Sequence, residues 1–354
     1  MKLKDLGFSE WFERRLRESG KTGYSLARII SVNKGSYVVR NEVSETLAEL
    51  TGEFIFSAES SLQYPIVGDW AYVQYYNANT LAIIYGLLPR KTILRRKTAG
   101  KKIDYQMIAS NIDMAFVVQS CDFNFNIHRL ERYLVMINDG QIDPVILLSK
   151  SDLVSQNDLE RKISEIQDTG IKCEIIAYSV ETGAGLPQIQ QVLKYGMTYC
   201  LLGSSGVGKT TLLNHLIGRS EFRINIIREK DGKGRHTTSR RQLVVLDQGA
   251  MLIDTPGMRE LGNIDMKSGI EKIFSDIFEM SDECRYRDCS HTNEVGCSVL
   301  QAVQSGSLNE AHYQDYLKLK RESEHYQLSY LEKRRKDRKF GQFIKTAKKQ
   351  NKKK

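Results

Sequence analysis

The sequence predicts an α/β P-loop domain placed between an N-terminal β-barrel and a C-terminal helical segment that binds a metal ion. Three observations predict this order. Short β-branched and aromatic runs occupy residues 25–88, apolar runs alternate with helical patterns over 112–254, and three cysteines and a histidine lie together at 284–297. With 354 residues the chain is long enough for two or three domains. The expected boundaries are 1–100, 101–265 and 266–354.

The composition is that of an ordinary globular chain, 41% hydrophobic and 27% charged. The first twenty residues are charged and amphipathic and contain no apolar core of a signal peptide. No apolar run approaches the length of about 18 residues that a membrane span needs. We therefore expect a soluble, cytoplasmic protein without a membrane partner. Six cysteines in a chain of this length do not indicate a disulfide scaffold.

Residues 25–88 are expected to form the five strands of a small closed barrel. The runs are β-branched or aromatic, and Gly, Asn, Asp and Pro separate them. The expected strands are SLARIISV, GSYVVR, FIFSAE, DWAYVQYY and TLAIIYGLL. Five strands in so short a segment are typical of an OB-fold. Such barrels bind single-stranded nucleic acid or act as structural and protein-docking modules, and the sequence leaves both readings open.

Positive charge is concentrated in two segments. The formal net charge is +9, whereas residues 333–354 alone hold twelve Lys/Arg and one Asp, so the rest of the chain carries −2. A second basic strip, residues 90–102, holds seven Lys/Arg and no acid. Local basic appendages usually meet a polyanion, and we expect the tail to bind RNA through phosphate contacts. The alternatives are a solvated, disordered tail and a plain linker.

From residue 112 to 254 the pattern changes to alternating strands and helices. Five apolar runs are expected to form buried parallel strands. They are MAFVVQS, PVILLS, CEIIAYS, MTYCLLG and MLID, and helical patterns such as NDLERKISEIQDT lie between them. This alternation predicts a doubly wound α/β sheet.

A phosphate-binding motif, G-x-x-x-x-G-K-[ST], follows one of these runs and opens a helical stretch, which is the context the motif needs. Its glycines let backbone N–H groups curl round phosphates, and the helix N-terminus adds a positive dipole. Lys209 is expected to neutralise the β- and γ-phosphates, and Thr210 to ligate Mg²⁺. The expected nucleotide contacts are Gly203, Ser204, Ser205, Gly206, Val207, Gly208, Lys209, Thr210 and Thr211.

The segment D-T-P-G at 254–257 ends the next apolar strand, 44 residues after Thr210. Asp254 is expected to hold the water shell of Mg²⁺, and Gly257 to offer an N–H to the γ-phosphate. Between the two motifs lies a polar loop, DGKGRHTTSRR, in which Thr237 or Thr238 can reach Mg²⁺ when the loop orders. These positions correspond to the two switch segments of a GTPase.

Guanine specificity needs a carboxylate that accepts from N1–H and N2–H₂, together with a flat contact over the ring. Ser149, Lys150 and Asp152 stand in an S-K-S-D segment that resembles the N/T-K-x-D motif, with Ser149 in place of the usual Asn. Ser179 and Val180 resemble the S-A-x element, whose backbone touches guanine O6. These base motifs precede the phosphate motif in the chain. The reversed order predicts a circularly permuted GTPase domain.

Cys284, Cys289, His291 and Cys297 form the pattern C-x₄-C-x-H-x₅-C. Three thiolates and one imidazole make a closed tetrahedral site for one structural Zn²⁺ per chain, with no ligand position left for water. The other three cysteines stand in or beside strand runs and are expected in the core.

The barrel, the permuted motifs and the Cys/His cluster together resemble the bacterial ribosome small-subunit-dependent GTPase family, also called RsgA or YjeQ. Its most specific segments here are GRHTT, DTPG and CRYRDCSHTNEVGC. The resemblance implies that His236 is the catalytic residue, because Met258 follows DTPG where many GTPases carry a water-orienting glutamine. It also favours Thr238 over Thr237 as the Mg²⁺ ligand.

The resemblance implies a late-acting assembly factor, expected to be a monomer, that binds the 30S ribosomal subunit and its 16S rRNA. It hydrolyses GTP, held with Mg²⁺, when docked there. The alternative is an rRNA-binding assembly module that uses GTP only as a conformational switch, and the departures at Ser149 and Val180 keep this alternative open. A permuted GTPase of the large subunit is disfavoured by the barrel and the Cys/His cluster.

Overall fold

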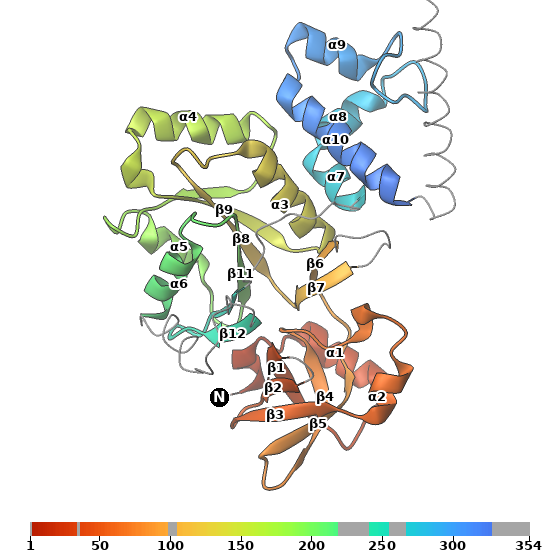
Figure 1. Ribbon diagram of the computed structural model, residues 1–354, viewed down its shortest axis with the longest axis vertical. Coiled ribbons are helices and arrows are strands. Elements are labelled where there is room, and N and C mark those ends of the chain that lie inside the picture. The colour runs from red at the N-terminus through yellow and green to blue at the C-terminus, as the bar shows by residue number, and fades with distance from the viewer. Residues whose placement is uncertain (1, 34–35, 98–104, 219–240, 255–266, 328–354) are drawn as a thin grey trace, which may run out of the picture. The chain divides into compact units, whose positions relative to one another are not determined.

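The computed structural model describes residues 2–33, 36–97, 105–218, 241–254 and 267–327 (Figure 1). The chain divides into two compact units. One comprises Met1–Arg96 and Tyr105–Leu261, and holds the barrel and the α/β sheet. The other comprises Lys97–Asp104 and Gly262–Lys354, and holds the Cys/His cluster. The division into three domains at 100 and 265 stays a prediction.

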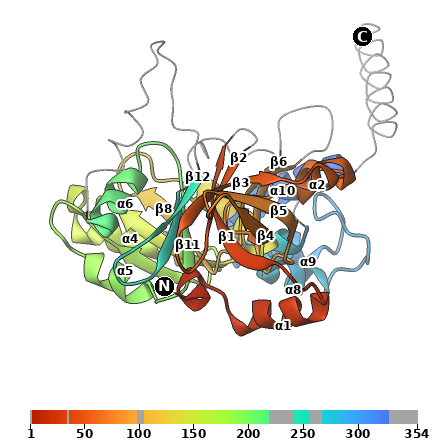
Figure 2. The same ribbon diagram turned by 90° about the horizontal axis from the view of Figure 1, so that it is seen from below.

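The N-terminal barrel is closed, as the sequence predicts. Its strand order is β1-β2-β3-β5-β4, and β4 pairs back with β1 (Figure 2). The pairs are antiparallel except β3 with β5, which are parallel. Small and β-branched side chains such as Ala27, Val39 and Ile84 fill the interior and are fully buried. The strands are β1 (Ser25–Asn33), β2 (Ser36–Arg40), β3 (Glu45–Leu50), β4 (Trp70–Tyr76) and β5 (Leu81–Leu87).

One expected strand of the barrel is wrong. The run FIFSAE forms most of the short helix α2 (Gly52–Ser57), and the third strand is the preceding segment ETLAEL. Thr51 begins the helix because its hydroxyl accepts from the Phe54 N–H at 3.0 Å. Phe56 is 94% exposed, so its apolar character did not signal burial. In ETLAEL the exposed and buried side chains alternate, which is the signature of a strand with one face in the core.

The N-terminal segment packs against the outer face of β4, because Trp70 and Tyr72 point away from the interior that Ala71 and Val73 fill. It contains the short 3₁₀ helix η1 (Leu3–Leu6) and the helix α1 (Glu10–Ser19). The Phe8 ring meets the buried Trp70 ring edge-on at 4.9 Å between centroids, and Phe12 packs beside both. This aromatic cluster explains the amphipathic pattern at the start of the chain, because the apolar face of the segment is buried in the core.

The second part of the first unit is the predicted α/β sheet. Its order is β10-β9-β8-β11-β13-β12, and the first five strands are parallel. β12 is an antiparallel strand that the periodicity did not reveal. The strands are β8 (Met114–Ser120), β9 (Asp143–Ser149), β10 (Glu174–Ala177), β11 (Thr198–Leu202), β12 (Arg241–Val245) and β13 (Met251–Asp254). The helices are α3 (Ile127–Asp139), α4 (Gln156–Gln167), α5 (Leu186–Val192) and α6 (Lys209–Ile217).

The basic strip at 90–102 is partly a strand. β6 (Ile93–Lys97) pairs with β7 (Tyr105–Ser110) in a separate two-stranded sheet. Arg95 forms an ion pair with Asp139 at 3.1 Å, and its guanidinium lies 4.6 Å from the centre of the Tyr105 ring. At least this arginine is therefore held by the fold and is not a free phosphate-binding side chain.

Barrel and sheet are joined by strand pairing and by one buried arginine. β1 pairs antiparallel with β12, so a single run of strands crosses from one to the other. Arg28 of β1 is 1% exposed. Its guanidinium donates to the Thr198 hydroxyl at 2.9 Å and to the Asn111 carbonyl at 3.1 Å. Burial lowers the pKa of Arg28 to about 10, against the opposing effect of Asp113 and Asp69, so it stays charged at neutral pH.

We expect Arg28→Met to destabilise the protein by about 2–4 kcal/mol, because buried acceptors on both sides of the junction lose their donor. Urea unfolding followed by circular dichroism measures the change. Arg40→Met is the matched control, since Arg40 forms a half-exposed ion pair with Glu45 and such pairs contribute at most about 1 kcal/mol. Equal effects of the two substitutions would contradict the role of Arg28.

The described part of the second unit is helical. It contains α7 (Lys267–Ile273), α8 (Ser275–Ser281), α9 (Ser298–Ser305) and α10 (Glu310–Gln327). Phe274 is fully buried and packs against the rings of His312 and Tyr316. Within the described ranges, no helix combines the length and the apolar character that crossing a membrane requires.

Candidate functional site

The candidate nucleotide site is assembled at one edge of the sheet. β8, β9, β10, β11 and β13 run parallel, so their carboxyl ends lie at the same edge. The S-K-S-D segment follows β9, the Y-S-V segment follows β10, the glycine-rich loop follows β11, and Asp254 ends β13. Ligands of open α/β sheets bind at this edge. The base segment at Ser149 and the glycine-rich loop at Gly203, 54 residues apart in the chain, thereby become neighbours.

The glycine-rich loop has the backbone that close approach to phosphates requires. Gly203 has a φ of 144°, and a Cβ atom there would lie 2.3 Å from the Val118 carbonyl oxygen, so only glycine fits. Gly208 has a φ of 93° and begins helix α6. The Lys209 ammonium donates to the carbonyls of Gly203 and Ser204 at 2.7 and 2.6 Å. The chain therefore curls tightly enough for the lysine to reach back across its own loop.

Ser149 ties the base segment to this loop. It is 2% exposed, and its hydroxyl donates to the Val207 carbonyl at 2.6 Å. The carbonyl of Gln119 lies farther away, at 3.2 Å. The usual asparagine is absent, but the link between the two motifs is still made, by a shorter side chain.

Asp122 is a site residue that the sequence reasoning missed. Lys150 has a left-handed backbone with φ 57°, and its ammonium forms an ion pair with the Asp122 carboxylate at 2.8 Å. Burial raises the pKa of Asp122, but hydrogen bonds from Lys150, Ser120 and the Asn124 N–H outweigh it and lower the pKa from 3.8 to about 2. The ion pair therefore stabilises the fold above about pH 4, and this contribution is lost as the pH falls towards 2.

The loop that carries Asp122 also contacts the glycine-rich loop. The Asn124 amide donates to the Ser205 carbonyl at 3.4 Å, and Asn126 caps helix α3 by accepting from the Arg129 N–H at 2.8 Å. The only sequence signal for this loop was its place after a strand at the same edge. Its run of Asp and Asn residues resembles an ordinary turn.

The base-segment residues and Asp254 lie at the ends of β9, β10 and β13. Ser179 is 1% exposed, and its N–H donates to the Ala184 carbonyl at 2.9 Å. Val180 is half-buried beside it, and Asp152 is exposed in a short 3₁₀ turn after β9. Asp254 is half-buried and pairs in register with Gln242. The expected contacts His236, Thr237, Thr238 and Gly257 lie outside the described residues, as does the tail at 333–354.

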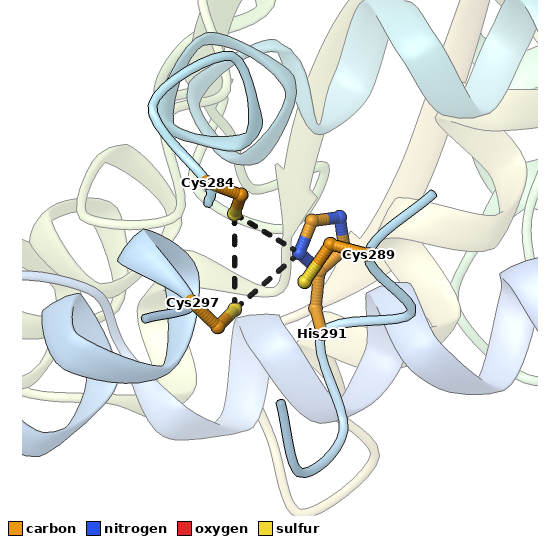
Figure 3. Close-up of side chains that lie close together, drawn as sticks. All are labelled: Cys284, Cys289, His291 and Cys297. Carbon is orange, nitrogen blue, oxygen red and sulfur yellow. Dashed lines mark hydrogen bonds between the residues drawn. The ribbon is translucent and has the colours of Figure 1, made fainter. Parts of the chain in front are cut away.

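The Cys/His cluster has the dimensions of a tetrahedral metal site (Figure 3). The sulfurs of Cys284 and Cys297 are 3.9 Å apart, and His291 Nδ1 lies 3.6 and 3.5 Å from them. With Cys289, the four ligand atoms lie within 4.8 Å of one another. Tetrahedral Zn²⁺, with Zn–S of about 2.3 Å and Zn–N of about 2.0 Å, has edges of about 3.8 and 3.5 Å. A disulfide would need about 2.05 Å, so the spacing fits a metal.

The surroundings favour the ligating forms of His291 and Cys284, but not that of Cys289. Burial lowers the pKa of His291 and keeps the imidazole neutral. Burial raises the pKa of Cys284, but N–H donors of Ser298 and Val299 outweigh it, so the net shift is downward. Burial raises the pKa of Cys289 to about 12, so a bound cation would have to displace the proton of this thiol, which leaves to solvent. Outside the cluster, the Tyr313 hydroxyl donates a hydrogen bond to the His291 backbone carbonyl.

Comparison with known proteins gives a consistent result. A family model described as RsgA GTPase matches residues 87–264. The chain is 39% identical over 345 residues to "Small ribosomal subunit biogenesis GTPase RsgA 1" of Bacteroides thetaiotaomicron, covering 97% of this chain and 96% of that protein. It is 40% identical to "Small ribosomal subunit biogenesis GTPase RsgA 2" of Lactiplantibacillus plantarum, covering 91% and 90%.

Two solved structures share the fold. The crystal structure of YjeQ from Thermotoga maritima superposes with a TM-score of 0.61 at 26% identity, covering 84% of this chain and 98% of that one. YloQ, described as a circularly permuted GTPase, superposes with a TM-score of 0.59 at 25% identity, covering 86% and 96%. The permuted order predicted from the motifs is thereby confirmed.

Proposed function

The chain belongs to the RsgA GTPase family, and on that premise we propose that it hydrolyses GTP to GDP and phosphate during late maturation of the small ribosomal subunit. The observation that carries the proposal is the convergence of base and phosphate motifs at one edge of a permuted sheet. The RsgA relatives are named for small-subunit biogenesis, which supports the 30S subunit and its 16S rRNA as partners in the cytoplasm.

The described residues have distinct proposed roles. Asp152 pairs with the guanine edge, the stem of Lys150 covers the ring, and the backbone at Val180 contacts O6. Lys209 neutralises phosphate charge, Thr210 ligates Mg²⁺, and Asp254 holds its water shell. The other nucleotide contacts are the backbone groups of the glycine-rich loop, from Gly203 to Thr211. Cys284, Cys289, His291 and Cys297 hold one structural Zn²⁺, which supplies rigidity and no reactive ligand position.

His236 is the proposed catalytic residue. Met258 stands where many GTPases have the glutamine that orients the attacking water, so another side chain must do this. An imidazole can position water or act as a weak base at neutral pH. His236 lies between the phosphate motifs and next to Thr237 and Thr238, of which we propose Thr238 as the Mg²⁺ ligand. All three are proposed to act with the nucleotide bound.

GTP hydrolysis should rise at least about tenfold when 30S subunits are added and should not change with 50S subunits. Docking can place His236 at the γ-phosphate, and correctly placed switch residues accelerate GTPases by orders of magnitude. Phosphate release is measured with purified protein alone and with each subunit. His236→Ala should abolish the stimulated rate while GTP still binds. Stimulation that survives this substitution would remove His236 from the mechanism, and equal, slow rates under all conditions would favour the alternative of an rRNA-binding module.

A further inference from the structure

Ser149 has fewer hydrogen-bond donors than the asparagine that usually occupies this position. A serine hydroxyl donates one hydrogen bond, and here it goes to the Val207 carbonyl at 2.6 Å. The asparagine usual at this position has two donor hydrogens and a carbonyl acceptor. The serine oxygen keeps its lone pairs, so it can accept a hydrogen bond from a neighbour while donating to the loop.

Tyr178 is that neighbour. It follows β10 and is 1% exposed. A Cβ atom built on Gly208 would lie 4.0 Å from the Tyr178 hydroxyl oxygen and 3.9 Å from Ser149 Oγ, so both hydroxyls lie beneath the start of helix α6. The Tyr178 hydroxyl is buried and makes no hydrogen bond of full geometry in the described part of the chain. Burial raises the pKa of the phenol, and the nearby Ser149 hydroxyl partly opposes this.

Ring packing and two backbone hydrogen bonds hold Tyr178 in place. Its ring belongs to the core cluster beneath the sheet edge, beside Leu147, Val207 and Leu212. Its N–H donates to the Leu148 carbonyl at 2.8 Å, and its carbonyl accepts from the Ser151 N–H at 3.2 Å. The backbone of Tyr178 is thus hydrogen-bonded to the residue before the S-K-S-D segment and to Ser151 within it. Its side-chain hydroxyl lies near Gly208 of the glycine-rich loop.

We propose that Tyr178 is a positioning residue for guanine nucleotides: when nucleotide is bound, its hydroxyl, which has no hydrogen-bond partner among the described residues, donates to the Ser149 hydroxyl and extends the bond from Ser149 to the Val207 carbonyl into a relay. The inference rests on the proposed function, because it concerns how the same site holds GDP and GTP.

Tyr178→Phe tests the relay, because it removes the hydroxyl and keeps the ring. Dissociation of a fluorescent GDP analogue from the full-length protein should become about five- to tenfold faster, the loss expected for one hydrogen bond. The melting temperature without nucleotide should stay the same or rise, since a buried hydroxyl without a good partner is removed. A purely structural tyrosine would not move the dissociation rate in this way.

The second variant is Ser149→Asn, alone and combined with Tyr178→Phe. Alone, the larger amide competes with the phenol for space and should also speed GDP dissociation. Combined, it occupies the space that the hydroxyl vacates and should bring the rate back to within about twofold of wild type. Tyr199→Phe is the matched control. Its hydroxyl donates to the Val192 carbonyl at 2.6 Å, and it stands near the amino end of β11, away from the loop, so its removal should leave GDP dissociation unchanged.

Wild-type dissociation rates for Tyr178→Phe, or a double variant no better than Ser149→Asn alone, would overturn the relay. Both outcomes presuppose a wild-type protein that binds GDP. A properly folded wild-type protein that bound neither GDP nor GTP would instead overturn the proposed function, so the two failures are distinguishable.

Discussion

Asp152→Asn should change the base preference of the protein from guanine to xanthine. The affinity for GDP should fall at least about 100-fold, and the affinity for xanthosine diphosphate should rise. In the proposed site, the Asp152 carboxylate accepts from N1–H and from the exocyclic amine of guanine. An asparagine amide turns one acceptor into a donor, which then faces the guanine amine. Xanthine has a carbonyl at that carbon, so the amide donor finds an acceptor. Buried polar groups left unpaired typically cost this much discrimination or more.

Competition of unlabelled nucleotides against a fluorescent GDP analogue measures the exchange. Asp158→Asn is the control, because Asp158 is an exposed acid at the start of α4 whose partner is Arg161, at 2.8 Å. It should leave the preference unchanged. Unaltered selectivity of GDP over its adenine and xanthine counterparts in Asp152→Asn would reject Asp152 as the base-reading residue, whatever the state of the phosphate loop.

Cys289→Ser should reduce bound zinc from one per chain to nearly none and unfold the Cys/His segment of the second unit. Removing one thiolate leaves three ligands, and structural zinc contributes on the order of 10–16 kcal/mol to the folding of small zinc domains. That is as large as the whole stability of a typical domain. The four candidate ligands come from the segment between α8 and α9, which has little core of its own, and the proposed zinc would hold this segment together.

Metal analysis after dialysis, together with hydrogen exchange of residues 282–297, measures this prediction. Cys173→Ser is the control, because Cys173 stands beside β10 in the first unit and has no part in the cluster. It should keep the zinc and the exchange protection. A wild-type protein that is stable and protected at these residues without any metal would refute the site.

Much of this molecule follows from patterns that are local in the chain. The glycine-rich motif, the strand endings at Ser149 and Asp254 and the Cys/His spacing each combine a residue type with a fixed offset. Parallel strands bring such motifs to one edge, so the location of the site follows once the strands are recognised. The barrel was foreseen for the same reason, except that the apolar run at α2 was read as a strand. A run of six residues is too short to distinguish the 3.6-residue period of a helix from the 2-residue period of a strand.

The sequence by itself determined which chemistry the chain carries: the nucleotide motifs, their permuted order, the metal ligands and the concentration of positive charge in the tail. Only the tertiary structure decided which side chains connect them. Arg28 joins barrel and sheet, Asp122 holds Lys150, and Tyr178 lies beneath the loop beside Ser149. None of these contacts has a sequence signature. Each joins residues more than 25 positions apart, and the groups that meet are backbone carbonyls, buried hydroxyls or a single charge, which no local pattern marks. Such pairs form only where packing has already brought two strands together.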